Sequence, residues 1–139
     1  MSTKVHDLAV NDSHEAVLVD DLSRTQIAMY AGASGDFNPL HSDEVYATQV
    51  AGYPSVIAHG ALTMGLTARL VTDWLDEGEV TGFGVRFLRQ VWPGDTLTGT
   101  ATVRATGVED GRDVVELDLV TVNQKGEQVV AGYARVHGL

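Results

Sequence analysis

The sequence predicts an α+β domain in which an antiparallel sheet wraps around one long helix. Residues 60–75 form a helical segment with apolar side chains on nearly every side, and a soluble helix of that kind needs burial on nearly every side. The segments after it alternate between apolar and polar residues, as strands do. A sheet curled around the helix is the simplest way to bury it. In the alternative, a helix lying flat on the sheet, part of its surface stays uncovered unless a partner covers it.

The residues before the long helix predict a strand and a shorter helix. Residues 15–21 have the apolar run of a short strand. Ser23 is a candidate N-cap for a helix over residues 24–33, and Gly32 and Gly35 are expected to end that helix. This half of the chain is therefore expected to consist of short elements separated by turns.

The second half of the chain predicts one strand after another. One segment directs Val115, Leu117 and Leu119 to one face and Glu116 and Asp118 to the other. Glycine-containing turns separate the segments. We therefore expect an antiparallel meander with one apolar face. The strands are expected at residues 80–91, 97–104, 115–119 and 129–136.

The composition excludes several classes of function. The chain has 139 residues and a formal net charge of −10, which disfavours binding to nucleic acid or to an anionic membrane surface. It has no cysteine, so a reducing cytoplasm is the expected location. The five histidines show no metal-ligand spacing, and no nucleotide-binding loop is present. We expect one domain over residues 1–139, with no metal, no cofactor and no membrane span.

The segment from Asp36 to His41 joins a carboxylate and an imidazole across a turn. Pro39 disfavours helix at Asn38 and can fold the two ionisable side chains together. Histidine titrates near neutral pH, and a neighbouring carboxylate can orient it. The pair therefore suits general acid–base catalysis, although the same residue types are common in surface turns. A further short helix is expected over residues 42–52.

A second candidate element lies where the long helix begins. The first turn of a helix has unpaired N–H groups and a partial positive charge. Gly60 has no side chain to keep a ligand carbonyl away from its N–H. That N–H is thus a candidate donor to an oxyanion, the alternative being a glycine that only sets the entry angle of the helix. Thr63 could hydrogen-bond a ligand nearby or bond back to its own helix.

Two motifs give the chain a resemblance to a known family. Residues 30–41 read YAGASGDFNPLH and residues 58–65 read AHGALTMG. Together they resemble the hydratase motif of the MaoC-like family, which includes (R)-specific enoyl-CoA hydratases and (3R)-hydroxyacyl thioester dehydratases. The β subunit of the actinobacterial hydroxyacyl-carrier-protein dehydratases is especially similar. Residues 85–87 (VRF) and 93–96 (PGDT) also fit the family pattern, so the resemblance covers nearly the whole chain.

The resemblance implies a fold and a set of catalytic residues. The fold is a hot-dog fold, and the implied assembly is a dimer in which two sheets join edge to edge. Asp36 and His41 would form the catalytic pair. Asn38 would orient the water, and Gly60 would supply the oxyanion donor through its N–H.

Substrate binding is assigned to three further residues, Thr63, His59 and Arg86. Arg86 and Arg89 are both candidates for the phosphates of the thioester carrier. Because residues three apart on a strand face opposite sides, at most one of them is expected to line the site. A solvated charge at the edge of the sheet is the alternative for either arginine.

The implied activity is reversible hydration of trans-2-enoyl thioesters to (R)-3-hydroxyacyl thioesters. The acyl group would be carried by coenzyme A or by acyl carrier protein. An acyl-CoA thioesterase and one subunit of a heteromeric hydroxyacyl-carrier-protein dehydratase are the alternative functions. We expect a homodimer, with a heterodimer as the alternative assembly.

Overall fold

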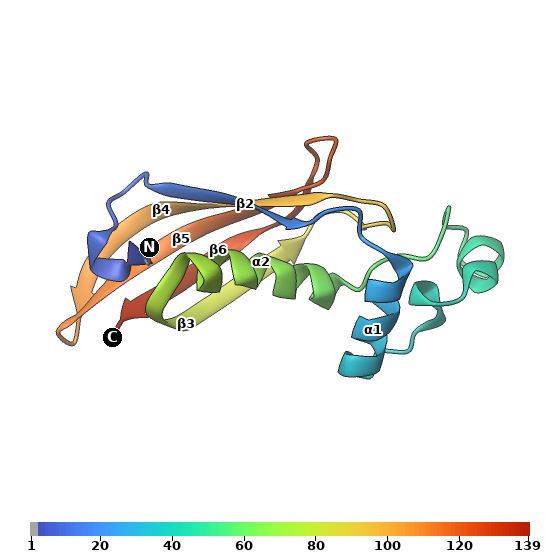
Figure 1. Ribbon diagram of the computed structural model, residues 1–139, viewed down its shortest axis with the longest axis horizontal. Helices are drawn as coiled ribbons and strands as arrows, with labels where there is room; N and C mark the ends of the chain where they lie inside the picture. Colours follow the sequence, from blue (N-terminus) through green and yellow to red (C-terminus); the bar gives the residue numbers. More distant parts are fainter. Residues whose placement is uncertain (1–2) are drawn as a thin grey trace.

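The computed structural model describes residues 3–139. These residues form one six-stranded sheet with the order β1-β3-β6-β5-β4-β2, and helix α2 lies along one face of it (Figure 1). The prediction of an α+β fold with an antiparallel sheet curled around one long helix is confirmed. The strands are β1 (Thr3–Lys4), β2 (Ser13–Val19), β3 (Leu75–Phe87), β4 (Leu97–Glu109), β5 (Arg112–Val122) and β6 (Gln128–Gly138), and the helices are α1 (Arg24–Ser34) and α2 (Gly60–Trp74).

The order of the strands differs from the predicted meander. Strands β4, β5 and β6 follow one another, but β3 pairs with β6 and β2 pairs with β4. The short β1 pairs with β3 in parallel. Helix α2 lies between β2 and β3 in the chain. After it, β3 lies on the opposite side of the sheet from β2. Residue patterns identify which segments are strands, but they do not identify these partners.

Strand β3 begins earlier and ends earlier than expected. It starts at Leu75, directly after α2, and ends at Phe87, whereas the pattern predicted residues 80–91. Gly78 in its first half and a register shift between Val80 and Gly82 weaken the alternation there. The residues after Phe87 therefore belong to the loop that leads to β4, a difference that matters for the site.

One side of α2 forms the centre of the core. Leu66, Leu70 and Val71 are buried against the sheet, where Leu117 and Leu119 are also buried. Two buried threonines on this side satisfy each other, since the Oγ1 atoms of Thr67 and Thr121 lie 2.8 Å apart.

The opposite side of α2 is open, so the expected burial on nearly every side is wrong for the single chain. Ala61, Gly65, Arg69 and Thr72 are exposed there, and Ala68 is half-buried. The sheet encloses only the other side of the helix. Small and polar residues make the open side tolerable in water, although a partner could cover it.

Local signals set both ends of α1, and only the role predicted for Gly32 is wrong. The Ser23 hydroxyl accepts a hydrogen bond from Gln26 N at 3.0 Å, which confirms the N-cap. Gly35 ends the helix in the left-handed region at φ 76°, whereas Gly32 lies inside it. The chain then passes through a π-helical turn, Tyr46–Val50. This whole segment projects beyond the end of the sheet (Figure 1).

The pairing of β3 with β6 depends on a glycine, which gives a prediction about stability. A Cβ atom at Gly132 would lie 2.0 Å from the carbonyl oxygen of Gly84. Because backbone cannot move aside cheaply, Gly132→Ala is expected to destabilise the fold by about 1–3 kcal/mol or more. Denaturant unfolding should show a lower midpoint. Gly107→Ala is the matched control, since its nearest neighbour would be Val114 Cγ1 at 3.7 Å. Equal midpoints for the two variants would contradict the close approach.

Candidate active site

A chain of short polar contacts builds the turn that follows α1. Asp36 N donates to the Ser34 hydroxyl at 3.2 Å, and Asn38 N donates to Asp36 Oδ1 at 3.2 Å. Leu40 N then donates to Asn38 Oδ1 at 3.0 Å. Pro39 opens a 3₁₀ turn that ends at His41. These contacts fix the backbone that carries both ionisable side chains.

The imidazole of His41 is held by the backbone in one tautomer. Its Nδ1 lies 2.7 Å from the carbonyl oxygen of Ile57, and a carbonyl oxygen can only accept, so Nδ1 carries the proton. In the neutral ring Nε2 is then a free acceptor. Asp36 Oδ2 lies 3.9 Å from that Nε2, which is too long for a direct hydrogen bond but can be bridged by one water.

Backbone hydrogen bonds bring this turn to the start of α2. Ile57 N donates to Leu40 O at 3.0 Å, and Ala58 N donates to Val91 O at 2.8 Å. The segment before α2 is thus anchored on one side to the turn and on the other to the loop after β3. Two motifs about twenty residues apart in the sequence therefore meet, as the sequence predicted.

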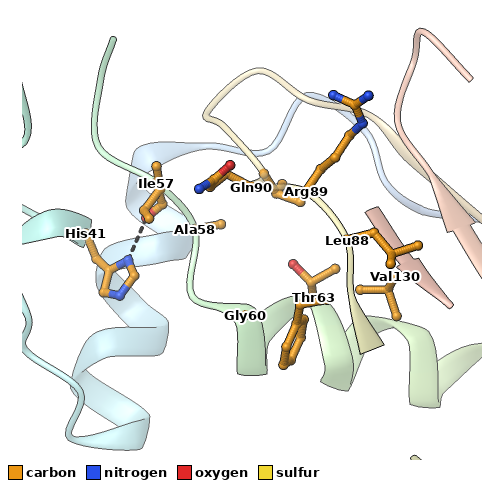
Figure 2. A pocket seen from close by; sticks show the side chains of 11 residues that line it. His41, Ile57, Ala58, Gly60, Thr63, Leu88, Arg89, Gln90 and Val130 are labelled. Atoms are coloured by element: carbon orange, nitrogen blue, oxygen red, sulfur yellow. Dashed lines mark hydrogen bonds between the residues drawn. The ribbon is translucent and has the colours of Figure 1, made fainter. Parts of the chain in front are cut away.

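His41 and the N-terminus of α2 line a common cavity of about 290 Å³. Figure 2 shows His41 on one side, Leu88 and Val130 on the other, and Gly60 and Thr63 between them. Most of the lining is apolar, which suits an acyl chain. The complete lining is His41, Ile57, Ala58, Gly60, Thr63, Phe87, Leu88, Arg89, Gln90, Val91 and Val130.

Gly60 is the first residue of α2 and lines this cavity. The N–H groups of Leu62 and Thr63 both donate to His59 O. The Gly60 N–H donates to no acceptor within residues 3–139, as expected for the first turn of a helix. The absence of a side chain is also a packing requirement, since a Cβ atom would lie 3.2 Å from Phe87 Cε1.

Thr63 lies one turn further along α2 and is nearly buried. Its carbonyl oxygen accepts from the Thr67 hydroxyl at 3.0 Å. Its own hydroxyl makes no hydrogen bond within residues 3–139, so the alternative of a bond back to its own helix is not observed. The side chain reaches the cavity, where Figure 2 shows it beside Gly60.

His59 lies behind His41 and not in the cavity wall. It is 1 % exposed, its ring stacks on that of His41 with centroids 3.7 Å apart, and its Nε2 lies 3.0 Å from Asp36 O. The substrate-binding role predicted for His59 therefore lacks a path to the substrate. The sequence could not indicate this, because a histidine before a helix is as often exposed as buried.

Two other predicted residues also lie away from the cavity lining. The Asn38 amide oxygen already accepts from Leu40 N, so it holds the turn. Arg86 lines a separate hollow with Gly84 and Tyr133. Arg89 lines the cavity instead, and it pairs with Glu127 at 3.0 Å. Because β3 ends at Phe87, strand alternation does not decide which arginine reaches the site.

Asp36, His41 and His59 place ligand-type atoms within 4.8 Å of one another. The two imidazole planes are only 22° apart, and the lone pair of an imidazole nitrogen lies in the ring plane. Near-parallel rings that are stacked do not direct these lone pairs at one point between them. Each ring also has one nitrogen bonded to a carbonyl oxygen. The cluster is therefore arranged for proton transfer more than for metal ligation.

An ion pair links α1 to the segment before α2. Arg24 donates to the Glu44 carboxylate at 2.5 Å, and Val56 N donates to the same carboxylate at 3.3 Å. The hydrogen bond from Arg24 is the main cause that lowers the pKa of Glu44 below its ordinary value. A lowered carboxyl pKa means that the link stabilises the fold above the ordinary carboxyl pKa and is lost as the pH falls through the lowered one.

Comparison with known proteins defines the class to which this fold and site belong. The MaoC-like domain family matches residues 7–126. An (R)-specific enoyl-CoA hydratase of Rhodospirillum rubrum is 33 % identical over 91 % of this chain and 87 % of its own length. The unliganded R-hydratase PhaJ1 of Pseudomonas aeruginosa superposes with a TM-score of 0.85 at 27 % identity, over 97 % of this chain and 84 % of that one. The chain belongs to the MaoC-like domain family, and its hot-dog fold is confirmed.

Several other relatives are much longer proteins. The 3-hydroxyacyl-thioester dehydratase Y of Mycobacterium tuberculosis is 40 % identical over 63 % of this chain, but the match spans only 31 % of the relative. The chain spans between 12 % and 32 % of the first four curated relatives that it matches. Within residues 3–139 no helix has the length and apolar character needed to cross a membrane.

Proposed function

We propose that the protein catalyses reversible hydration of trans-2-enoyl thioesters to (R)-3-hydroxyacyl thioesters. One observation carries the proposal. His41, whose Nε2 lies 3.9 Å from the Asp36 carboxylate, lines the same cavity as Gly60, the first residue of α2. A base and an oxyanion donor thus face the same space. The names of the relatives, which include enoyl-CoA hydratases and a thioester dehydratase, support this reading.

The reaction follows from these groups. A water held between Asp36 and His41 gives a proton to His41 Nε2 as its oxygen attacks C3 of the enoyl group. The electron pair of the C2=C3 bond moves to the thioester oxygen, which accepts from Gly60 N–H, a contact typically worth about 3–4 kcal/mol. The proton then passes to C2, and the carbonyl forms again. Dehydration is the reverse sequence with the same groups.

The substrate is proposed to be an acyl-CoA. Ile57, Val91 and Val130 give the cavity an apolar lining for the acyl chain. Arg89 at the same cavity supplies a positive charge, in place of Arg86, for the phosphates of the carrier. A net charge of −10 disfavours an acidic carrier protein as the partner, and this favours the free coenzyme.

We propose a homodimer of single-domain subunits. Strands β1 and β6, from the two ends of the described chain, lie in the same sheet. Within residues 3–139, no strand pairs with the outer edge of β3 beyond Glu77. Val80, Phe87 and Leu88 are exposed along that edge, next to the open side of α2.

The absence of cysteine also suits a cytoplasmic setting.

An assay on enoyl substrates tests the function. We expect the purified protein to remove the enone absorbance of crotonyl-CoA and of longer enoyl-CoA esters without release of free thiol. Size-exclusion chromatography of the same sample reports the oligomeric state. Thiol release from acyl-CoA without loss of the enone would instead identify a thioesterase. Absence of both activities would contradict the proposal.

A further inference from the structure

We propose that His59 is a positioning residue that stays neutral, anchors Asp36 and leaves His41 as the group that accepts the proton. This inference rests on the proposed hydration chemistry for its catalytic meaning. Its structural basis is separate, because it depends on how the two imidazoles and the Asp36 backbone contact one another.

The imidazole of His59 is held in one tautomer. Its Nε2 lies 3.0 Å from the carbonyl oxygen of Asp36, and since that oxygen can only accept, Nε2 carries a proton. Its Nδ1 is buried and has no hydrogen-bond partner within residues 3–139. The ring of His59 is therefore a neutral imidazole whose Nδ1 carries no proton. His41 has the opposite tautomer, with its proton on Nδ1.

The surroundings of His59 disfavour its cationic form. Protonation would place an N–H on Nδ1 with no acceptor, at the cost of burying an unpaired donor. His59 is also the N-cap of α2, where the partial positive charge of the helix disfavours a cation. Three groups face the ring of His59. They are the Tyr30 ring in an edge-to-face contact with centroids 4.8 Å apart, the His41 ring with centroids 3.7 Å apart, and the Asp36 backbone. The Asp36 carboxylate, which would favour a cation, lies within 4.8 Å of a His59 ring nitrogen, but it is about half exposed to solvent and lies 3.9 Å from His41 Nε2.

A neutral His59 leaves His41 as the only imidazole of the pair that can take up a proton. Two stacked imidazoles whose ring centroids lie 3.7 Å apart cannot both be cations without strong repulsion. Because His59 resists protonation, the one proton goes to His41, whose Nε2 faces Asp36 and the cavity. The stacked ring also keeps water from one face of His41.

The turn that carries Asp36 is anchored by His59. The side chain of Asp36 is about half exposed, and the turn around it is held by local hydrogen bonds. The bond from His59 Nε2 to Asp36 O ties that turn to a buried side chain 23 residues away. A misplacement of about 1 Å at a reacting group can cost about 10²-fold in rate. The anchor therefore sets the distance between the Asp36 carboxylate and His41.

Two substitutions separate the anchor from the stacked ring. His59→Phe keeps a ring on His41 but removes the donor to Asp36, so kcat should fall by about 10–100-fold with the acid limb of the kcat/KM pH profile in place. His59→Gln keeps an N–H donor but removes the ring. Its kcat should fall less than that of His59→Phe, because a donor to the Asp36 carbonyl oxygen is kept. KM should change little in either variant, since His59 does not line the cavity.

A measurement on the unaltered protein covers the case in which the variants fail to fold. Imidazole ¹⁵N chemical shifts should show His59 neutral, with the proton on Nε2, throughout the pH range in which His41 titrates. A cationic His59 in that range would overturn the proposal. So would a folded His59→Phe variant that keeps the kcat of the unaltered enzyme, or a His59→Gln variant that loses as much kcat as His59→Phe. If the unaltered enzyme lacks hydratase activity, the proposed function fails, and the ¹⁵N shifts still decide the state of His59.

Discussion

Asp36→Asn and His41→Ala are each expected to lower kcat for enoyl-CoA hydration by about 10²–10⁴-fold. Asparagine keeps an oxygen that can accept from Asn38 N, so the turn should survive. It removes the negative charge beside His41 Nε2. Alanine at position 41 removes the base itself. Initial rates of enone loss over a range of substrate concentrations would give kcat and KM for each variant.

The two losses are not expected to add. If Asp36 and His41 hold and activate the same water, removing one disables the other, so the double variant should resemble the slower single variant. Asp113→Asn is a suitable control, because Asp113 is an exposed carboxylate on β5, far from the turn in the fold. That variant should keep the kcat of the unaltered protein. Folded variants of Asp36 or His41 with unchanged turnover would remove both residues from the mechanism.

The sequence predicted the elements of this fold better than their arrangement. The apolar segment at α2 and the alternation in β5 depend on neighbours along the chain, so they can be read from residue patterns. The pairing of β3 with β6 depends on where α2 carries the chain. The open side of α2 was missed for a related reason. An apolar or small-residue surface indicates that burial is favourable, but it does not say which subunit provides it.

The candidate site divides in the same way. Asp36, His41 and Gly60 lie in short motifs whose chemistry is visible in the residue types, and the fold brings the motifs together. His59 and Arg86 could not be placed from the sequence. The place of His59 depends on burial behind another ring. The choice between Arg86 and Arg89 depends on the residue at which β3 ends.

The oxyanion donor can be tested by removing a single N–H group from the backbone. Gly60→Pro deletes the N–H at the first position of α2, where helices tolerate proline. His59 has φ −63° and ψ 136°, the extended conformation that a residue before proline requires. The helix should therefore form, while kcat falls by about 10²–10³-fold because the developing enolate loses its donor.

Gly60→Ala is the matched control for this substitution. Both variants introduce a Cβ atom 3.2 Å from Phe87 Cε1, and Phe87 is exposed enough to shift. Alanine keeps the N–H, so its loss of kcat measures the crowding alone. The ratio of the two kcat values then reports the loss of the N–H together with the Cδ atom that replaces it, with thermal unfolding used to verify that both variants are folded. A ratio near one would mean that the enolate is stabilised by some group other than the Gly60 N–H, and the helix N-terminus would then only position the turn.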